Sequence, residues 1–348
     1  MHGGLTLSSS QLTMLDANMT VVVEKTHMTD WTDVFLGTLF PAVPVPFDDD
    51  GEPDFDALGK IAAWMRKQPV DGIAVWTRTG RGSRLPREIR LKIIDLWLEA
   101  LEGLRFIAEI APPHDTPANS VTKKAVEVAQ DAVGKADYFL VTSPAAYRDV
   151  SDRNDKILEH HRAIAELGVP LILSCSSPST GGITYSGKLL SALLDTQEVA
   201  AVLTDLPNNP SALQDLITYI RVGWPQTAIL SGEDRMYGYT FYRGCHGSLA
   251  AIGSICPRLQ RELIDAWFMG DSAKFLNLSR LADHIAEAIC IEPKEGILQR
   301  ILTGLSHQGI ISEDSTNDPW GPPVSPQEEE LVRATLDAIG EWSDARPS

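Results

Sequence analysis

Four short apolar segments follow one another between residues 170 and 253: PLILSCS (170–176), VAAVLTD (199–205), AILSGED (228–234) and GSLAAIG (247–253). The preceding part of the chain holds four more of the same kind: GTLFPAV (37–43), GIAVWT (72–77), RFIAEIA (105–111) and YFLVTS (138–143). Longer stretches that are apolar at helical spacing separate them, for example DKILEHHRAIAELG (155–168). Strands that alternate with helices are typical of a parallel sheet. Eight such units predict an α/β protein, a closed (β/α)8 TIM barrel with its pocket at the C-terminal strand ends.

The chain continues well beyond the eighth predicted strand. Four more stretches are typical of helices: RLQRELIDAWFMG (258–270), SAKFLNLSRLADHIAEAI (272–289), PKEGILQRILTGLSHQG (293–309) and PQEEELVRATLDAIGEW (326–342). A barrel needs one helix after its last strand. We therefore expect a flexible N-terminal extension at 1–30, barrel strands and intervening helices at 31–257, and a final barrel helix with extra C-terminal helices at 258–348.

Composition excludes several classes of protein. The formal net charge of −17, with no run of clustered Lys and Arg, argues against nucleic-acid binding. No apolar stretch approaches the roughly 18 residues that span a bilayer, and the N-terminal residues lack a basic region followed by an apolar core. The four cysteines show no CxxC spacing. We expect a cytoplasmic protein that acts on a small molecule.

Polar residues stand at the predicted strand ends, where barrel sites lie. Arg78 follows the second strand and is a candidate for binding an anion or for a surface ion pair. Glu109 lies within the third strand, where a buried carboxylate must be paired or functional. Thr204 and Asp205 end the sixth strand, and Asp205 could act as a general base or cap the next turn.

Two further carboxylates, Glu233 and Asp234, end the seventh strand. With Glu109 and Asp205 they offer oxygen ligands of the kind a divalent cation prefers. Their spacing does not show that they converge, so we expect neither a metal nor another cofactor and keep a metal site as an alternative.

Five segments carry a resemblance to a known family: GTLFPAVPVPFDDDGEPD (37–54), LSGED (230–234), RGCHGSLAAIGSICP (243–257), IEPKEGILQRILTGL (291–305) and PPVSPQEEELVRATLDAIG (322–340). In this order, and with eight strands, the chain resembles the dihydrodipicolinate synthase and N-acetylneuraminate lyase family over residues 35–340. The resemblance implies a 2-oxo acid held as a Schiff base on a lysine of the sixth strand. It also implies a proton-relaying tyrosine on the fifth strand, a carboxylate-binding turn after the second, and a homodimer or homotetramer.

The lysine that this resemblance implies is absent. The alignment of VAAVLTDLPNN places Thr204 at the lysine position and Asp205 at the acid that follows it. A shift of one residue would place Leu203 there, and no lysine lies between Lys188 and Lys274. The imine therefore cannot form on this strand.

The other implied site residues also differ. In LILSCSSPSTGG (171–182), Ser174 takes the place of the catalytic tyrosine, so a hydroxyl is kept. In WTRTGRGS (76–83), Arg78 and Thr79 lie over the paired threonines of the carboxylate turn, followed by Gly80, with Arg81 over the glutamate. A guanidinium binds a carboxylate through two parallel hydrogen bonds, so this turn is predicted to bind an anion.

Three residues complete the predicted site. Tyr147, in SPAAYRD, lies near the segment that carries a second family tyrosine, which in the family can enter a neighbouring subunit's site. Ser231 and Gly253 come from the two segments that end the seventh and eighth strands, and both are candidates for binding substrate.

Three hypotheses follow from these residues. The first is a divergent lyase or aldolase-like enzyme that binds a small carboxylate or 2-oxo acid without an imine. In it, Arg78 and Thr79 hold the anion, and Asp205, Glu109 or Ser174 moves protons. The second is a non-catalytic family member that binds a metabolite or acts as a structural subunit. The third is a metal-assisted enolising enzyme. We favour the first, because the pocket positions are replaced by polar residues, which a decayed site would lose.

Overall fold

A computed structural model describes residues 29–176, 182–207 and 209–340 of the chain. The predicted N-terminal extension, residues 1–30, lies outside these ranges except for its last two residues. Asp30 caps the first helix, α1 (Trp31–Phe35), by accepting a hydrogen bond from the backbone N–H of Thr32.

The described residues form one eight-stranded sheet of parallel strands, and all eight predicted strands are present. The strands are β1 (Leu39–Pro41), β2 (Gly72–Val75), β3 (Arg105–Ile110), β4 (Tyr138–Val141), β5 (Leu171–Ser176), β6 (Val199–Asp205), β7 (Ala228–Ser231) and β8 (Gly247–Ala250). Their order is β1-β8-β7-β6-β5-β4-β3-β2. A parallel bridge between Ala42 and Ala74 joins the first two strands, so the sheet closes on itself. The prediction of a (β/α)8 barrel with extra C-terminal helices is confirmed.

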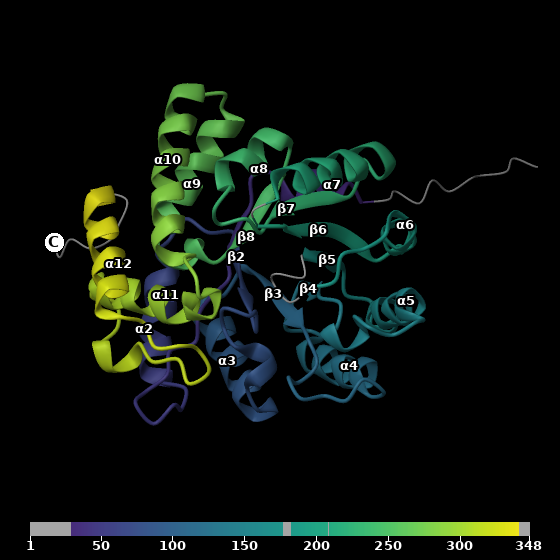
Figure 1. Ribbon diagram of the computed structural model, residues 1–348, viewed down its shortest axis with the longest axis horizontal. Coiled ribbons are helices and arrows are strands. Elements are labelled where there is room, and N and C mark those ends of the chain that lie inside the picture. Colours follow the sequence, from purple (N-terminus) through teal and green to yellow (C-terminus); the bar gives the residue numbers. More distant parts are fainter. Residues whose placement is uncertain (1–28, 177–181, 208, 341–348) are drawn as a thin grey trace, which may run out of the picture.

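Helices surround the strands, as Figure 1 shows. Those of the barrel wall are α2 (Phe55–Met65), α3 (Arg87–Ala100), α4 (Val121–Ala132), α5 (Arg153–Ala165), α6 (Gly187–Leu194), α7 (Pro210–Gly223), α8 (Tyr237–Arg243) and α9 (Pro257–Phe268). Short 3-10 helices include η1 (Gly82–Arg84), η2 (Ala145–Tyr147) and η4 (Ile252–Ser254). Within the described residues, no helix is long and apolar enough to cross a membrane.

The extra C-terminal helices gather beside α2 on one side of the barrel (Figure 1). They are α10 (Ser272–Ile289), α11 (Ile297–His307) and α12 (Pro326–Ile339). Arg300 of α11 is fully buried and pairs with Glu328 of α12 at 2.6 Å. Glu328 also forms a capping box with Ser325, which holds the pKa of this carboxyl low, at about 2. These bonds fix α12 against α11.

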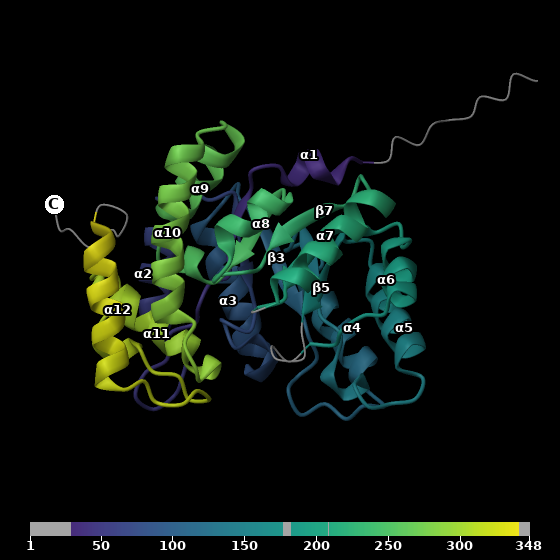
Figure 2. The same cartoon turned by 45° about the horizontal axis from the view of Figure 1, so that its top comes forward.

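Two apolar layers make up the core. One fills the barrel and contains Ala74, Ile107 and Ile172, and the other lies between strands and helices and contains Ala108 and Leu173. Neighbouring residues of a strand thus face opposite layers, as the two-residue period of a strand requires. At the N-terminal end of the strands, Phe35 of α1 packs on the rings of Phe40 and Tyr138 and closes the barrel. Figure 2 shows the helix α1.

Candidate active site

The strand period decides which side chains reach the open, C-terminal end of the barrel. On β3, Ile107 fills the interior, so the next inward-facing residue is Glu109. On β5 and β6 the same rule brings Ser174 and Asp205 to the mouth. These three predicted site residues line one cavity of about 510 Å³.

The turn after β2 brings Arg78 and Thr79 into the same cavity. Two residues of this turn have left-handed backbone, Trp76 (φ 60°) and Arg81 (φ 54°), a conformation that is uncommon outside glycine. The backbone N–H of Arg78 donates to Glu109 Oε2 at 3.1 Å, and its guanidinium Nη2 lies 3.7 Å from Asp205 Oδ2. The turn thus joins carboxylates from two strands, Glu109 through the backbone N–H of Arg78 and Asp205 through its guanidinium.

Arg81 lines the cavity too, but its guanidinium has a different partner. It forms a buried ion pair with Asp318, from the segment that precedes α12, and donates to the carbonyl oxygen of Glu295 at 2.8 Å. The C-terminal addition therefore holds the turn that presents Arg78.

Burial raises the pKa of three carboxyl groups at this end of the barrel. The pKa of Glu109 rises to about 7, although the charge and the backbone N–H of Arg78 act to lower it. The pKa of Asp234 rises to about 6, although hydrogen bonds from the N–H groups of Ile252 and Ala251 act to lower it. The pKa of Glu233 rises to about 8, although a hydrogen bond from the backbone N–H of Leu206 acts to lower it. The charge of Asp205 raises all three pKa values further. Carboxyl groups whose pKa values lie near neutrality can both give and accept protons.

On β6, the residues that face the cavity are not the ones that the sequence alignment predicted. Thr204 does not line the cavity: it is fully buried, and its hydroxyl donates to the carbonyl oxygen of Leu230 at 3.3 Å. Leu203 and Asp205, on either side of it, face the cavity instead. Leu203 thus stands at the inward position where the resemblance implies a lysine. Among the described lining residues there is no lysine at all.

Ser231 is also placed away from the cavity. It pairs with Thr204 across the sheet and is fully buried, whereas Gly232 and Asp234, further along the chain, line the cavity.

The two predicted glycines have packing roles in this structure. A Cβ on Gly253 would lie 2.7 Å from Gln260 Oε1 of α9, so a larger residue there would require the Gln260 side chain to move. A Cβ on Gly80 would lie 3.0 Å from the carbonyl oxygen of Val43. Neither glycine lines the cavity.

Tyr147 points toward the helical layer. Its hydroxyl lies 2.9 Å from Thr122 Oγ1 on α4, and its ring meets the ring of His160 on α5 edge to face. It does not line the cavity of this chain.

Several lining residues were not singled out from sequence. Ser176, Arg84 and His114 line the cavity together with Leu203. Ser176 and Leu203 could have been predicted from the two-residue period of a strand, since each lies two residues from another inward-facing residue. Arg84 and His114 come from loops, whose path sequence periodicity does not describe.

The four carboxylates considered for a metal do not converge on one point. Among the residues described, no three His, Cys, Asp or Glu side chains are close enough to hold a metal ion. Their oxygens are instead used by backbone N–H groups and by Arg78.

The chain matches the model of the dihydrodipicolinate synthetase family over residues 35–339. The chain belongs to this family. A 4-hydroxy-tetrahydrodipicolinate synthase of Parasynechococcus marenigrum is 27% identical over 309 residues, 86% of this chain and 93% of that protein. The same enzyme of Thermodesulfovibrio yellowstonii is 24% identical, over 81% of this chain and 91% of that protein.

Solved structures of the dihydrodipicolinate synthetase family share the fold. Dihydrodipicolinate synthase from Aquifex aeolicus has a TM-score of 0.75 at 22% identity, covering 88% of this chain and 99% of its own. YagE, a prophage protein of Escherichia coli K12 solved with pyruvate, has a TM-score of 0.76 at 20% identity, with coverages of 87% and 98%. N-acetylneuraminate lyase from Proteus mirabilis has a TM-score of 0.73 at 18% identity, with coverages of 88% and 99%. Membership of this family supports an aldolase-like lyase.

Proposed function

We propose that this chain is an aldolase-like lyase that acts on a small carboxylate or 2-oxo acid without forming an imine on lysine. One observation carries the proposal. At the mouth of a cavity whose described lining has no lysine, Arg78 contacts Glu109 through its backbone N–H and Asp205 through its guanidinium.

Arg78 is suited to bind the acid group of the substrate. Its side chain is 59% exposed and forms part of the cavity wall, and its contact with Asp205 is long. A substrate carboxylate can pair with the guanidinium through two parallel hydrogen bonds, which fixes its orientation. Thr79, the next residue in the same turn, adds a hydroxyl to this end of the cavity.

Glu109 is suited to move the proton. When a base removes a proton from the carbon beside a carbonyl, the electron pair moves onto the carbonyl oxygen as an enolate. In the cleavage direction, a base takes the proton of the hydroxyl on the departing carbon, which becomes a carbonyl, and the electrons of the breaking carbon–carbon bond move to the same enolate oxygen. An acid then returns a proton to carbon. The pKa of Glu109, about 7, populates both its ionised and its protonated form at neutral pH. The positive charge of Arg78 stabilises the enolate oxygen, which is the task that an iminium performs elsewhere.

Removal of the Arg78 guanidinium tests the proposal. We expect Arg78→Ala to weaken the binding of pyruvate and other 2-oxo acids at least tenfold, as loss of a charge-assisted hydrogen bond does. Arg78→Lys should recover part of this loss, because it keeps the charge without the fork of donors. Isothermal titration calorimetry measures both affinities.

Arg87→Ala is a matched control, because Arg87 is an exposed arginine paired with Asp131 outside the cavity. It should bind these acids as the unaltered chain does. Equal binding by Arg78→Ala and the unaltered chain would remove the proposed anchor.

A further inference from the structure

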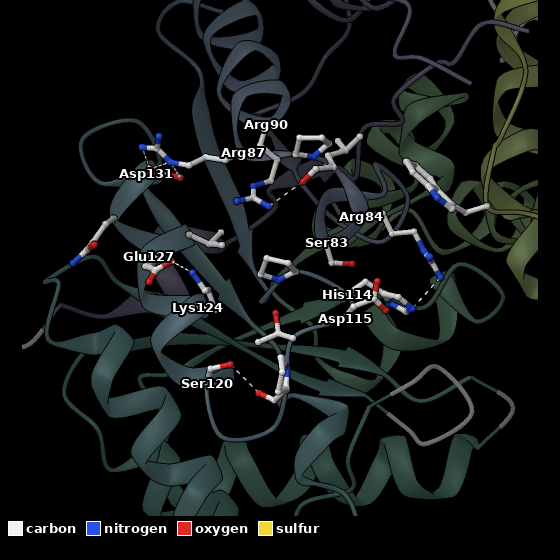
Figure 3. Close-up of a pocket in the computed structure, with 18 residues that line it drawn as sticks. Ser83, Arg84, Arg87, Arg90, His114, Asp115, Ser120, Lys124, Glu127 and Asp131 are labelled. Carbon is white, nitrogen blue, oxygen red and sulfur yellow. Dashed lines mark hydrogen bonds and ion pairs between the residues drawn. The ribbon is translucent and has the colours of Figure 1, made fainter. Parts of the chain in front are cut away.

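Arg84 stands on a wall shared by two cavities. The larger, about 810 Å³, lies beside the candidate active site, between η1 and the start of α3 on one side and α4 on the other (Figure 3). The residues that line both cavities are Ser83, Arg84, Pro113, His114 and Thr116. Arg84 therefore stands between the candidate active site and a second cavity.

Arg84 lacks the carboxylate partner that three other arginines of the two cavities have. Arg78, Arg81 and Arg87 pair with Asp205, Asp318 and Asp131. Within the described ranges, Arg84 has no carboxylate within ion-pair distance. Its contacts are an imidazole nitrogen, His114 Nε2, at 3.1 Å and the ring of Trp320, whose centroid lies 5.9 Å from its Cζ.

These two contacts hold the guanidinium without neutralising it. A guanidinium has donors only, so His114 Nε2 accepts the hydrogen bond and the proton of a neutral imidazole is on Nδ1. Trp320 is itself fixed by an edge-to-face contact with Phe47, with ring centroids 5.4 Å apart. Figure 3 shows Arg84 and His114 turned toward each other at one side of the cavity. Arg84 thus presents a fixed positive charge, and His114 an N–H donor, beside the substrate cavity.

We propose that Arg84 and His114 bind a second acid group of the substrate, so that the enzyme's substrates are 2-oxo acids with two carboxylates. This rests on the proposed function, in which Arg78 holds the carboxylate next to the carbonyl. Five guanidinium donors and the planar shape of the group fit a second carboxylate as well as the first. Within the described residues the exposed guanidinium of Arg84 has no carboxylate partner, so it is available to an anion beside the candidate active site.

The test compares acids that differ only at their far end. 2-Oxoglutarate and 2-oxoadipate carry a second carboxylate, and 2-oxopentanoate and 2-oxohexanoate carry a methyl group in its place. Calorimetry with the full chain should give at least tenfold tighter binding for one diacid than for its matched monoacid, the gain expected of a charge-assisted hydrogen bond. Arg84→Gln should remove this preference and leave the affinity for the monoacid unchanged.

Arg87→Gln, three residues further along and paired with Asp131, should keep the preference for the diacid. Thermal melting checks that both variants are folded, which their exposed positions favour. Equal affinity for diacid and monoacid in the unaltered chain, or a preference that survives Arg84→Gln, would overturn the distal site while the proposed function stands. If neither diacid nor monoacid binds, the proposed function fails and the distal site fails with it.

Discussion

Glu109, on β3, accepts hydrogen bonds from the backbone N–H of Arg78 and from the hydroxyl of Thr142, the residue after β4. Its pKa of about 7 results from burial, which outweighs the stabilising charge of Arg78. An anion that binds Arg78 adds negative charge next to Glu109, and a neighbouring negative charge raises the pKa of a carboxyl group. Binding of a 2-oxo acid should therefore draw a proton onto Glu109.

We predict net proton uptake when a 2-oxo acid binds between pH 7 and 8. In this range the pH lies above the Glu109 pKa of about 7, so the carboxyl group is mostly ionised before the acid binds. Titration calorimetry in buffers of different ionisation enthalpy measures it. Glu109→Gln should abolish the uptake, whereas Glu127→Gln, an exposed glutamate paired with Lys124, should not. Uptake of equal size in Glu109→Gln would show that another group takes the proton.

At this scale the sequence predicted some site residues and missed others for a definable reason. Arg78, Glu109 and Asp205 were expected at the cavity from their positions on the strands and Ser174 from the family resemblance, and all four line the cavity. Thr204 was expected on the wrong face, because an alignment shifted by one residue moves every side chain of a strand to the other side. Only the burial of its neighbours decides that register.

Helix α5 carries two adjacent histidines whose environment affects stability. His160 and His161 are almost completely buried, and the Nε2 atoms of both lack a hydrogen-bond partner in the described part of the chain. His161 Nδ1 bonds with the carbonyl oxygen of Ile157 at 2.8 Å, so it carries the proton of the neutral ring. Burial lowers the pKa of His160 to about 3 and that of His161 to about 4. Both rings are therefore neutral in the folded protein at pH 7.

These histidines should make the protein sensitive to acid. As the pH falls below about 6.5, the unfolded chain binds protons on these rings while the folded chain does not. The free energy of unfolding is then lost progressively until the pH reaches the folded-state pKa, about 4 for His161. For His161 alone the loss between these limits is about 3 kcal/mol.

Urea unfolding at a series of pH values measures this loss. In His161→Leu the free energy of unfolding should fall less steeply between pH 6.5 and pH 4 than in the unaltered chain. His284→Gln, which changes an exposed histidine of α10, should leave the slope as it is. An unchanged slope in His161→Leu would mean that this ring is not held neutral by burial.

For the whole molecule, periodicity and the number of strands were sufficient to predict the barrel and its additional helices. Each predicted strand exists, although several are shorter, such as Ala228–Ser231 within the predicted 228–234. The contact between Arg81 and Asp318 joins residues 237 positions apart, and no local pattern indicates such a pair. The expected homodimer or homotetramer stays a prediction.

The absence of an imine is the central claim, and borohydride reduction tests it most directly. The protein is incubated with pyruvate and reduced with sodium borohydride, and its intact mass is measured by mass spectrometry. A family member that carries the sixth-strand lysine serves as the positive control. We predict an adduct of one pyruvate on that family member and none on this chain, because Leu203 and not a lysine faces the cavity. One pyruvate bound per chain on any lysine of this protein would contradict the claim and restore Schiff-base chemistry.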